Sequence, residues 1–532
     1  MMPSDSSEKL PYNTSPQKSE QVAPYSQGVK GLDVVNVAVI GAGLTGLSAA
    51  LRLHQKGVSV AVIESKSDVG GAISSEMISD GSVLEWGPHT IQNTGSDIMA
   101  LIDELGITPL EADSTCKKRF IFYKGRLREV PSSLLSFLMT PLLSPLAKLR
   151  LLAEPIIPGS CQSHDETVSE WVTRRLGREV TQNLMAPFLS GVYAGDPARM
   201  SAVSVLKTLA RWEKRYSSIT AGALNTVANT LTKKMIRGKE DGKPNKTSRP
   251  YALINFNGGM QVLPREMAQH LPEDSIYCNE YVMAVEPEGN NLSEPDWYRV
   301  VTNRRTLRAQ SVVCTAPAYV ASQLDVPVNQ DVTEALSQIP YAPMALVSVR
   351  FKRSDFEKAL DGFGVLIPRE EGLRLLGSIW VSCLFPKRAP KDPKTGEETV
   401  LLSCFVGGAT DRAVINTPKE QLIEHVVSEL HALLPLKNQA CPLWVESQLI
   451  EQAIPQYEVG HRERVGTIQK WNKANPSCVF VGNYLMGVSL NDCVKQGNET
   501  AVSVFSDLES RQLLSGGTVR EQALNELYSA SS

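Results

Sequence analysis

The residues that decide the fold are VVNVAVIGAGLTGLSAALRLHQKGVSVAVIE, which occupy positions 34–64. The run VVNVAVI is short and continuously apolar, which is typical of a strand buried on both faces. GAGLTG follows at once, and the spacing of Leu and Ala in LSAALRLHQKG is helical, with Gly57 where a helix would end. VSVAVIE then predicts a second buried strand. Strand, turn, helix and strand in this order predict a right-handed βαβ unit with parallel strands.

The turn of this unit has the G-x-G-x-x-G spacing of a dinucleotide-binding loop. Gly41 permits the tight turn, Gly43 lets a diphosphate approach the backbone, and Gly46 allows the helix to pack closely on the strand. Glu64 ends the second strand, and an acid there suits a ribose hydroxyl and disfavours a 2′-phosphate. We therefore expect a nucleotide cofactor, and the competing interpretation is a glycine-rich turn that binds none.

Composition and charge restrict the class of protein. The chain has 532 residues, of which 42% are hydrophobic and 21% charged, so its bulk is folded rather than disordered. Its formal net charge of −3 argues against nucleic-acid binding. The nine cysteines include no C-x-x-C pair, so we expect no disulfide framework, no metal site and a reducing compartment. No apolar run is long enough to predict a membrane-spanning helix.

Changes in composition divide the rest of the chain. Residues 1–30 are polar and lack Arg, so they resemble neither a signal nor a transit peptide. Strand-like runs such as MALVSVRF (344–351), LLGSIWVSCLF (375–385) and TVLLSCFVGG (399–408) predict a mixed sheet near the C-terminus, with a charged insert, PKRAPKDPKTGEET, at 386–399. The expected segments are a disordered tail (1–33), a first part of the nucleotide-binding domain (34–114), a helical domain (115–220), a mobile loop (237–250), a second part of the nucleotide-binding domain (251–325), a substrate domain (326–465), a third part of the nucleotide-binding domain (466–510) and a C-terminal tail (511–532).

A leucine-rich stretch, PSSLLSFLMTPLLSPLAKLRLLAEPIIP, runs from 131 to 158 and is interrupted by prolines and charges. Short apolar helices beside basic residues are typical of an element that lies in a membrane interface. The alternative is an ordinary helical subdomain whose leucines face the core, and both interpretations stay open here. The basic residues just before the stretch are Lys117, Lys118, Arg119, Lys124, Arg126 and Arg128.

Further glycines follow the ribose acid in SKSDVGGAIS (65–74) and DGSVLEWGPHTI (80–91), and EYVMAV (280–285) and VGNYLMGVSLNDCVKQG (481–497) complete the set. Together these segments resemble the superfamily of FAD-binding amine oxidases and phytoene desaturases. A typical member carries Arg before Val-Gly-Gly, where this chain has Asp68. The resemblance implies FAD as the cofactor, bound by Gly41, Ala42, Gly43, Leu44, Thr45, Gly46, Glu64, Ser65, Gly70, Gly71, Ala72, Gly87, Pro88, His89, Val282, Gly482, Asn483, Gly487, Val488 and Ser489.

Five more segments are similar to the protoporphyrinogen IX oxidase family, in its plastid and bacterial branch. They are KRFIFYKGRLREVP (118–131), PFLSGVYAGDP (187–197), GFGVLIP (362–368), LGSIWVSCLFPKRAP (376–390) and QAIPQYEVGH (452–461). The resemblance covers residues 37–508. One departure is Ile450, where the family would have Trp.

Site roles follow from this second resemblance. It implies that Arg119 anchors a propionate, because a guanidinium can grip a carboxylate with two hydrogen bonds. It also implies that a glycine-rich wall at Gly191 leaves room for the pyrrole rings. Neither a catalytic side chain nor a metal is expected, because the flavin carries the chemistry. Arg119 could instead be a surface cation, and the ring-clamping residues could be ordinary core residues; they are Leu366, Ile379 and Phe405.

The implied fold is α/β of mixed type. It comprises a Rossmann-like FAD-binding domain of the p-hydroxybenzoate hydroxylase kind, a mixed-sheet substrate domain and a helical domain that contacts a membrane. The leading hypothesis is the six-electron oxidation of protoporphyrinogen IX by FAD and oxygen, which releases hydrogen peroxide, in haem or tetrapyrrole synthesis. The alternatives are a coproporphyrinogen III oxidase, a flavin amine oxidase and a flavin-free binding protein of the same fold, like the GDP-dissociation inhibitors.

The resemblance also implies where the protein acts. We expect peripheral attachment to a membrane surface, a homodimer and contact with ferrochelatase. Because the N-terminal tail is unlike a transit peptide, we favour the cytoplasmic face of a bacterial inner membrane over a plastid or mitochondrion.

Overall fold

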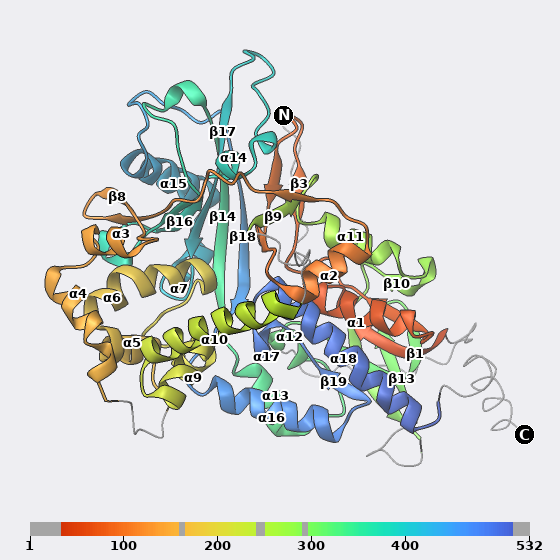
Figure 1. The fold of residues 1–532 in the computed structure, drawn as a ribbon. Coiled ribbons are helices and arrows are strands. Elements are labelled where there is room, and N and C mark those ends of the chain that lie inside the picture. Colours follow the sequence, from red (N-terminus) through yellow and green to blue (C-terminus); the bar gives the residue numbers. More distant parts are fainter. Residues whose placement is uncertain (1–32, 159–164, 241–250, 290–295, 514–532) are drawn as a thin grey trace, which may run out of the picture.

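The computed structural model describes residues 33–158, 165–240, 251–289 and 296–513 (Figure 1). Two seven-stranded sheets form the centre of the molecule, together with two small sheets. Residues 1–32, 241–250 and 514–532, which hold most of the predicted tails and loop, lie outside the described residues.

The predicted βαβ unit is confirmed, and it contributes two neighbouring strands to the first large sheet. β1 (Asp33–Ile40) pairs in parallel with β2 (Val60–Ile63), and α1 (Leu44–Gln55) connects them. The helix ends as predicted, since Gly57 adopts a φ of +81° just beyond it. The strand order is β10-β2-β1-β13-β12-β11, with β19 also paired to β13. The other strands are β10 (Ile276–Tyr277), β11 (Val282–Glu288), β12 (Trp297–Thr302), β13 (Thr306–Cys314) and β19 (Cys478–Phe480).

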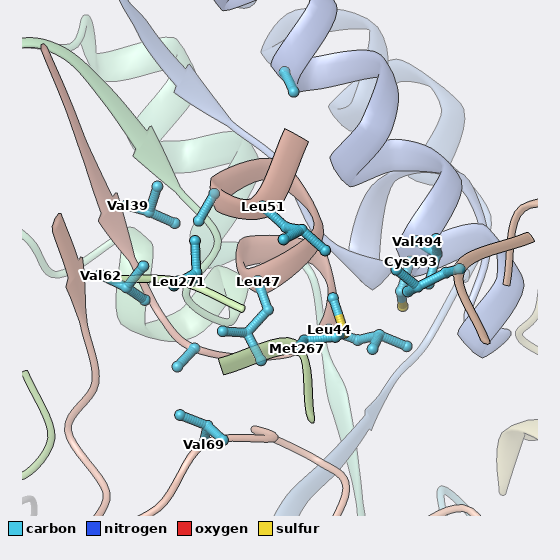
Figure 2. Packing of buried hydrophobic residues seen from close by; sticks show 14 of the residues in the cluster. Val39, Leu44, Leu47, Leu51, Val62, Val69, Met267, Leu271, Cys493 and Val494 are labelled. Carbon is cyan, nitrogen blue, oxygen red and sulfur yellow. The ribbon is translucent and has the colours of Figure 1, made fainter. Parts of the chain in front are cut away.

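Helix α1 is buried between this sheet and α18 (Leu490–Ser510). Figure 2 shows Leu47 and Leu51 of α1 among Val39 and Val62 of the sheet and Val494 of α18. Complete burial of one such side chain stabilises the fold by about 1.5–3 kcal/mol, so this layer holds the glycine loop rigidly. The other helices around the sheet are α2 (Ser96–Glu104), α11 (Val262–Gln269), α12 (Ala318–Ala321), α13 (Gln330–Ser337), α16 (His461–Ala474) and α17 (Asn483–Met486).

The second large sheet is mixed, as predicted, and has the order β18-β14-β17-β16-β15-β7-β8. α15 (Lys419–Leu433) packs on one of its faces. The strands are β7 (Arg119–Tyr123), β8 (Arg126–Glu129), β14 (Tyr341–Lys352), β15 (Gly364–Leu366), β16 (Leu375–Ile379), β17 (Thr399–Gly407) and β18 (Trp444–Pro455).

Three expectations need correction. The hairpin β7–β8 falls in the segment predicted as helical, but it joins the second sheet because β7 pairs in parallel with β15. The run 375–385 is a strand only to Ile379 and continues as α14 (Val381–Leu384). The boundary at 466 falls inside α16, whose Val465 and Ile468 share a cluster with Phe480 of the first sheet. The first of these errors arises because β15, the strand that pairs with β7, lies far away in sequence.

The leucine-rich stretch and the residues after it are helical, as predicted, and lie beside the second sheet in Figure 1. The last helix extends to Glu240, into the predicted loop, because Lys, Arg and Glu are good helix formers. The helices are α3 (Leu134–Met139), α4 (Pro145–Leu152), η1 (Glu154–Ile156), α5 (Val168–Leu176), α6 (Arg178–Val180), η2 (Thr181–Met185), α7 (Ala186–Tyr193), α8 (Ala202–Val205), α9 (Lys207–Tyr216) and α10 (Ile219–Glu240).

The remaining elements of the described chain are short. One small sheet is the hairpin β3-β4, and the other has the order β5-β9-β6. The remaining elements are β3 (Ser75–Met77), β4 (Val83–Glu85), β5 (Ile91–Gln92), β6 (Pro109–Glu111), β9 (Leu253–Phe256), η3 (Glu273–Ser275), η4 (Arg353–Asp355), η5 (Arg369–Glu371), η6 (Pro386–Arg388) and η7 (Arg412–Asn416).

Candidate active site

The glycine loop lies between β1 and α1, and its first and last glycines have no room for a side chain. Gly41 has a φ of +101°, and a Cβ atom on it would lie 2.9 Å from Oγ1 of Thr315. A Cβ atom on Gly46 would overlap with the carbonyl oxygen of Gly41. Gly43 precedes α1, whose start has no capping side chain and no acidic residue in its first turn. The amides of the first turn, which includes Leu44 and Thr45, are therefore available to an anion.

Glu64 lies at the end of β2 and is buried. Its Oε2 accepts a hydrogen bond from the Ala42 amide at 2.8 Å, and its Oε1 accepts one from the Lys66 amide at 2.9 Å. The carboxylate therefore joins the glycine loop to the exposed turn at Ser65. The Glu280 amide donates to the Glu64 carbonyl at 2.9 Å, which brings the start of β11, with the buried Val282, to the same place.

The predicted second glycine turn lies directly against the first. The Gly70 amide donates to the Ala42 carbonyl at 2.8 Å. A Cβ atom on Gly71 would lie 3.0 Å from the Cα atom of Gly43. Since Gly70 and Gly71 both have positive φ angles, any other residue would strain this turn.

Asp68 has a partner of opposite charge on another element. Its Oδ2 accepts hydrogen bonds from Nε and Nη2 of Arg265, on α11, at 3.0 and 2.6 Å. Gln261 donates from its side-chain amide to the Val69 carbonyl. Although the family's usual Arg is missing at position 68, a guanidinium therefore lies beside this turn.

The C-terminal flavin-like segment meets the first glycine loop. A Cβ atom on Gly497, in α18, would lie 2.5 Å from the carbonyl oxygen of Thr45, so the two helices are in backbone contact near their starts. Ser489 caps α18, because its Oγ accepts a hydrogen bond from the Asp492 amide at 3.1 Å. The predicted residues between β19 and this cap are Gly482, Asn483, Gly487 and Val488.

A third glycine segment, at Gly87, lies against the second glycine turn. A Cβ atom on Gly87 would overlap with the carbonyl oxygen of Ala72, so these two backbones touch. Pro88 and His89 follow Gly87 and lead towards the second sheet.

His89 is buried between the glycine segment at Gly87 and strand β17 of the second sheet. Its Nε2 lies 2.7 Å from Oγ of Ser403 on β17, and its Nδ1 lies 2.9 Å from the Gly87 carbonyl oxygen. Because a carbonyl only accepts hydrogen bonds, Nδ1 carries the proton and Nε2 accepts the Ser403 hydroxyl hydrogen. Burial lowers the pKa of His89 to about 4, so its ring is neutral near pH 7.

The predicted substrate residues share one face of the second sheet. Gly364 lies opposite both Arg119 and Ile379. Gly377 lies opposite both Leu366 and Phe405. Residues directly opposite each other, and every second residue along a strand, point to the same face, so one face carries Arg119, Leu366, Ile379 and Phe405.

Two contacts close this face. The ring of Phe405 packs edge-on against His89, with 5.3 Å between ring centroids. A Cβ atom on Gly191, in α7, would lie 2.5 Å from Cδ2 of Leu366. The sheet face therefore lies between the His89 segment and α7.

Arg119 is exposed at the edge of this face and has partners that sequence reasoning missed. Its Nη2 donates to the Tyr251 hydroxyl at 3.3 Å, and its guanidinium lies 5.5 Å from the centroid of the Phe363 ring. Tyr251 begins the segment that leads into β9, and no local sequence signal relates it to Arg119. The guanidinium keeps free donors for a carboxylate.

This arrangement fits a flavin dinucleotide beside an apolar ring system. The uncapped start of α1 suits a diphosphate, Glu64 suits a ribose, and the glycine turns let a flat ligand approach the backbone. In the described part of the chain, no group of three or more His, Cys, Asp or Glu side chains could hold a metal ion.

Comparison with known proteins agrees with this description. Residues 44–505 match the family of flavin-containing amine oxidoreductases. The mitochondrial protoporphyrinogen oxidase of Nicotiana tabacum is 30% identical over 506 residues, which are 92% of this chain and 98% of that protein. The coproporphyrinogen III oxidase of Bacillus subtilis is 25% identical over 489 residues, which are 88% and 97% of the two chains.

A solved structure from Exiguobacterium sp. 255-15, a candidate protoporphyrinogen oxidase, superposes with a TM-score of 0.71 over 90% of this chain and 100% of its own, at 20% identity. At that identity the likeness establishes the fold. The expected α/β fold is thereby confirmed, the membrane contact of its helical domain stays a prediction, and the family match confirms FAD as the cofactor. The chain belongs to the flavin-containing amine oxidoreductase family and is an FAD-dependent oxidoreductase homologous to the protoporphyrinogen oxidases.

Proposed function

We propose that this protein oxidises protoporphyrinogen IX to protoporphyrin IX, with molecular oxygen as acceptor, in tetrapyrrole biosynthesis. The observation that carries the proposal is the sheet face that joins one exposed cation to three apolar side chains beside the buried His89. The 30% identity to the tobacco mitochondrial enzyme, over almost its whole length, supports the substrate class.

The reaction removes six hydrogen atoms from the macrocycle as three pairs. Bound FAD supplies the two-electron acceptor, and each pair finally reduces one oxygen molecule to hydrogen peroxide. Three oxygen molecules are therefore consumed for each porphyrin formed.

The side chains of the protein bind and orient the substrate. The Arg119 guanidinium binds a propionate at the solvent edge, where the substrate's charge remains hydrated. Leu366, Ile379 and Phe405 contact the apolar rings and exclude water from them. His89 stays neutral and holds its segment to Ser403, so its role is structural rather than that of an acid or base.

The experiment follows porphyrin fluorescence while purified protein, in detergent and air, receives protoporphyrinogen IX or coproporphyrinogen III. Heat-inactivated protein corrects for spontaneous oxidation. We expect a faster rise with protoporphyrinogen IX. A preference for coproporphyrinogen III would transfer the assignment to the activity named for the Bacillus subtilis relative. Inertness towards both, with amine-dependent peroxide formation, would indicate an amine oxidase, and a protein that binds no flavin would indicate a binding protein.

We also propose that the protein attaches to a membrane surface through the leucine patch. The patch is defined by seven exposed apolar side chains, with exposures from 50% for Leu138 to 83% for Ile156. α4 has no buried residue, and Nζ of its Lys148 donates to the Leu138 carbonyl of α3 at 2.8 Å, so the two helices are adjacent. An apolar surface of this kind marks an interaction site. The members of the patch are Leu135, Leu138, Met139, Leu146, Leu149, Leu152 and Ile156.

Among the helices of the described ranges, none is long and apolar enough to span a bilayer. Flotation with liposomes tests the surface attachment. We expect the wild-type protein to float and the double variant Leu146→Glu/Leu149→Glu to stay at the bottom. Val502→Glu changes an equally exposed apolar residue on α18 and serves as the matched control, which should float. Equal flotation of all three proteins would refute the patch.

The homodimer, the ferrochelatase contact and the bacterial inner-membrane location stay predictions. Sedimentation velocity tests the first of these, and co-purification from membranes tests the other two.

A further inference from the structure

Arg388 is buried although it belongs to a charged segment of the chain. It ends η6, in the run 386–399, and is only 3% exposed. The run 386–399 is a charged insert in the sequence, so burial of a guanidinium at this point needs a reason. Buried charges cost free energy unless they are paired and hydrogen-bonded.

Arg388 lies in the connection between β16 and β17 of the second sheet. Its guanidinium contacts β4 and β9, two elements beside the flavin-binding sheet. Its Nη1 donates to Oε1 of Glu85, at the end of β4, at 2.5 Å. Its Nη2 donates to Oδ1 of Asn255 at 2.6 Å and to the Phe256 carbonyl oxygen at 2.9 Å, both on β9. One side chain therefore connects three segments.

Glu85 is equally enclosed. Its carboxylate also accepts hydrogen bonds from Oγ of Ser75 at 2.5 Å, from Nδ2 of Asn255 at 3.0 Å and from the Met260 amide at 3.1 Å. With Arg388 this makes four donors on one carboxylate, so its position is closely determined.

The network continues to the candidate flavin segment. Nδ2 of Asn255 also donates to the His89 carbonyl oxygen, at 2.6 Å. The His89 ring is in turn hydrogen-bonded to Ser403, next to Phe405 on the proposed substrate face. Arg388 itself follows Ile379 through the short helix α14. Residues 376–390 therefore carry both Ile379, on the proposed substrate face, and Arg388, which is linked to the His89 segment through Asn255.

We propose that Arg388 and Glu85 form a clamp that positions residues 85–89 against the flavin and joins the substrate sheet to the flavin-binding part. This inference rests on the proposed function. Arg388 acts through Glu85 and Asn255 and touches no reacting atom, so it is a positioning residue. Its loss loosens both the bound flavin and the surroundings of its ring.

The test compares FAD affinity and the flavin absorption spectrum in four variants. Arg388→Met removes the clamp, and Arg388→Lys keeps a charge for Glu85 without the second and third contacts. Glu85→Gln/Arg388→Met removes both buried charges and so avoids an unpaired carboxylate. Arg175→Met is the matched control, because Arg175 is an equally buried arginine paired with Glu154 in the helical region.

We expect Arg388→Met to raise the dissociation constant of FAD by at least about tenfold and to shift the visible flavin bands. Arg388→Lys should recover part of both losses. The double variant should regain thermal stability and keep the weak FAD binding and the altered spectrum. Arg175→Met should lose thermal stability and bind FAD within about twofold of the wild-type value.

Two outcomes would overturn the clamp. One is wild-type FAD affinity and spectrum in Arg388→Met, and the other is full recovery of both in the double variant, which would reduce the pair to a charge balance. In either case a wild-type protein that binds FAD and oxidises porphyrinogen leaves the proposed function intact. A wild-type protein that binds no FAD would remove both proposals.

Discussion

The side chain of Leu366 lies directly against Gly191, so that a Cβ atom at position 191 would be 2.5 Å from Cδ2 of Leu366. This contact sets the distance between α7 and the second sheet at the face that carries the proposed substrate residues. A Cβ atom at position 191 would displace Cδ2, which is the end of the flexible Leu366 side chain, and no backbone atom would have to move. The space in front of the sheet would therefore change.

Gly191→Ala should therefore impair substrate binding more than stability. The added methyl turns Leu366 into the proposed ring site, and we expect KM for the porphyrinogen to rise by about tenfold. Overpacking and the better helix propensity of Ala oppose each other, so the free energy of unfolding should change by less than about 1 kcal/mol. Steady-state kinetics and thermal unfolding check this. Gly191→Ala/Leu366→Ala should have the same KM as Leu366→Ala alone, because the added methyl then meets no side chain at position 366, and an unchanged KM in the Gly191→Ala variant would contradict the contact's role.

Gly46→Ala and Gly57→Ala should behave differently although both replace glycines of the βαβ unit. At Gly46 the methyl overlaps with the Gly41 carbonyl, which cannot move, so we expect loss of FAD binding and of soluble protein. At Gly57 nothing lies within 4 Å of the new atom, and only the positive φ costs about 1 kcal/mol. Flavin content after purification measures the difference. Normal flavin in Gly46→Ala would refute the close packing.

Arg119→Ala should weaken substrate binding with little effect on the chemical step. A charged hydrogen bond contributes about 1.5–3 kcal/mol, so KM should rise by roughly tenfold or more while kcat changes less. Arg126→Ala, on the neighbouring strand β8, is the control and should retain the wild-type KM. If both variants match the wild type, Arg119 is an ordinary surface cation.

His89 should make stability depend on pH in a defined window. Burial lowers its pKa to about 4 from 6.5, so between these values the unfolded chain binds more protons than the folded one. Stability is then fully present above about pH 6.5 and is lost as the pH falls to 4, by roughly 3 kcal/mol for this group. His461, whose pKa burial lowers to about 3, acts in the same direction.

The difference between the wild type and His89→Asn in the slope of the urea midpoint against pH, between pH 4.5 and 6.5, isolates the contribution of His89 from that of His461. His89→Asn should flatten this slope relative to the wild type, because one proton-binding difference is gone. Val502→Asn, at an exposed position of α18, adds no titratable group and should leave the slope unchanged. Parallel curves for His89→Asn and wild type would show that His89 does not resist protonation.

The ion pair of Asp68 and Arg265 should tolerate exchange of its charges. Asp68→Arg and Arg265→Asp each place two like charges together beside the second glycine turn, and we expect FAD binding to weaken by a factor of about three to five, since exposed pairs contribute up to about 1 kcal/mol. The double variant Asp68→Arg/Arg265→Asp should return near the wild-type affinity, as measured by FAD titration. Additive losses in the double variant would show that the two side chains act independently.

Local spacing in the sequence was sufficient to predict the glycine loop, the helix α1 and the acidic residue Glu64 at the end of β2. The glycine loop, α1 and Glu64 all lie within residues 34–64, and the close contacts of Gly46 with Gly41 and of Glu64 with Ala42 fall inside that range. The resemblance to a porphyrinogen-oxidising family and the FAD requirement followed from such segments, and the comparisons confirm both.

Long-range packing decided the rest, because burial and strand partners depend on residues far away in sequence. The pairing of β7 with β15 puts Arg119 on the sheet of Leu366, while a local pattern placed it in a helical domain. The leucines of α4 were compatible with core or surface until the fold left Leu146, Leu149 and Leu152 exposed. Arg388 belongs to the charged insert at 386–399, and the approach of β4 and β9 supplies the acceptors for its buried guanidinium. The sequence by itself thus determined the cofactor loop, and the tertiary structure decided which distant side chains surround it.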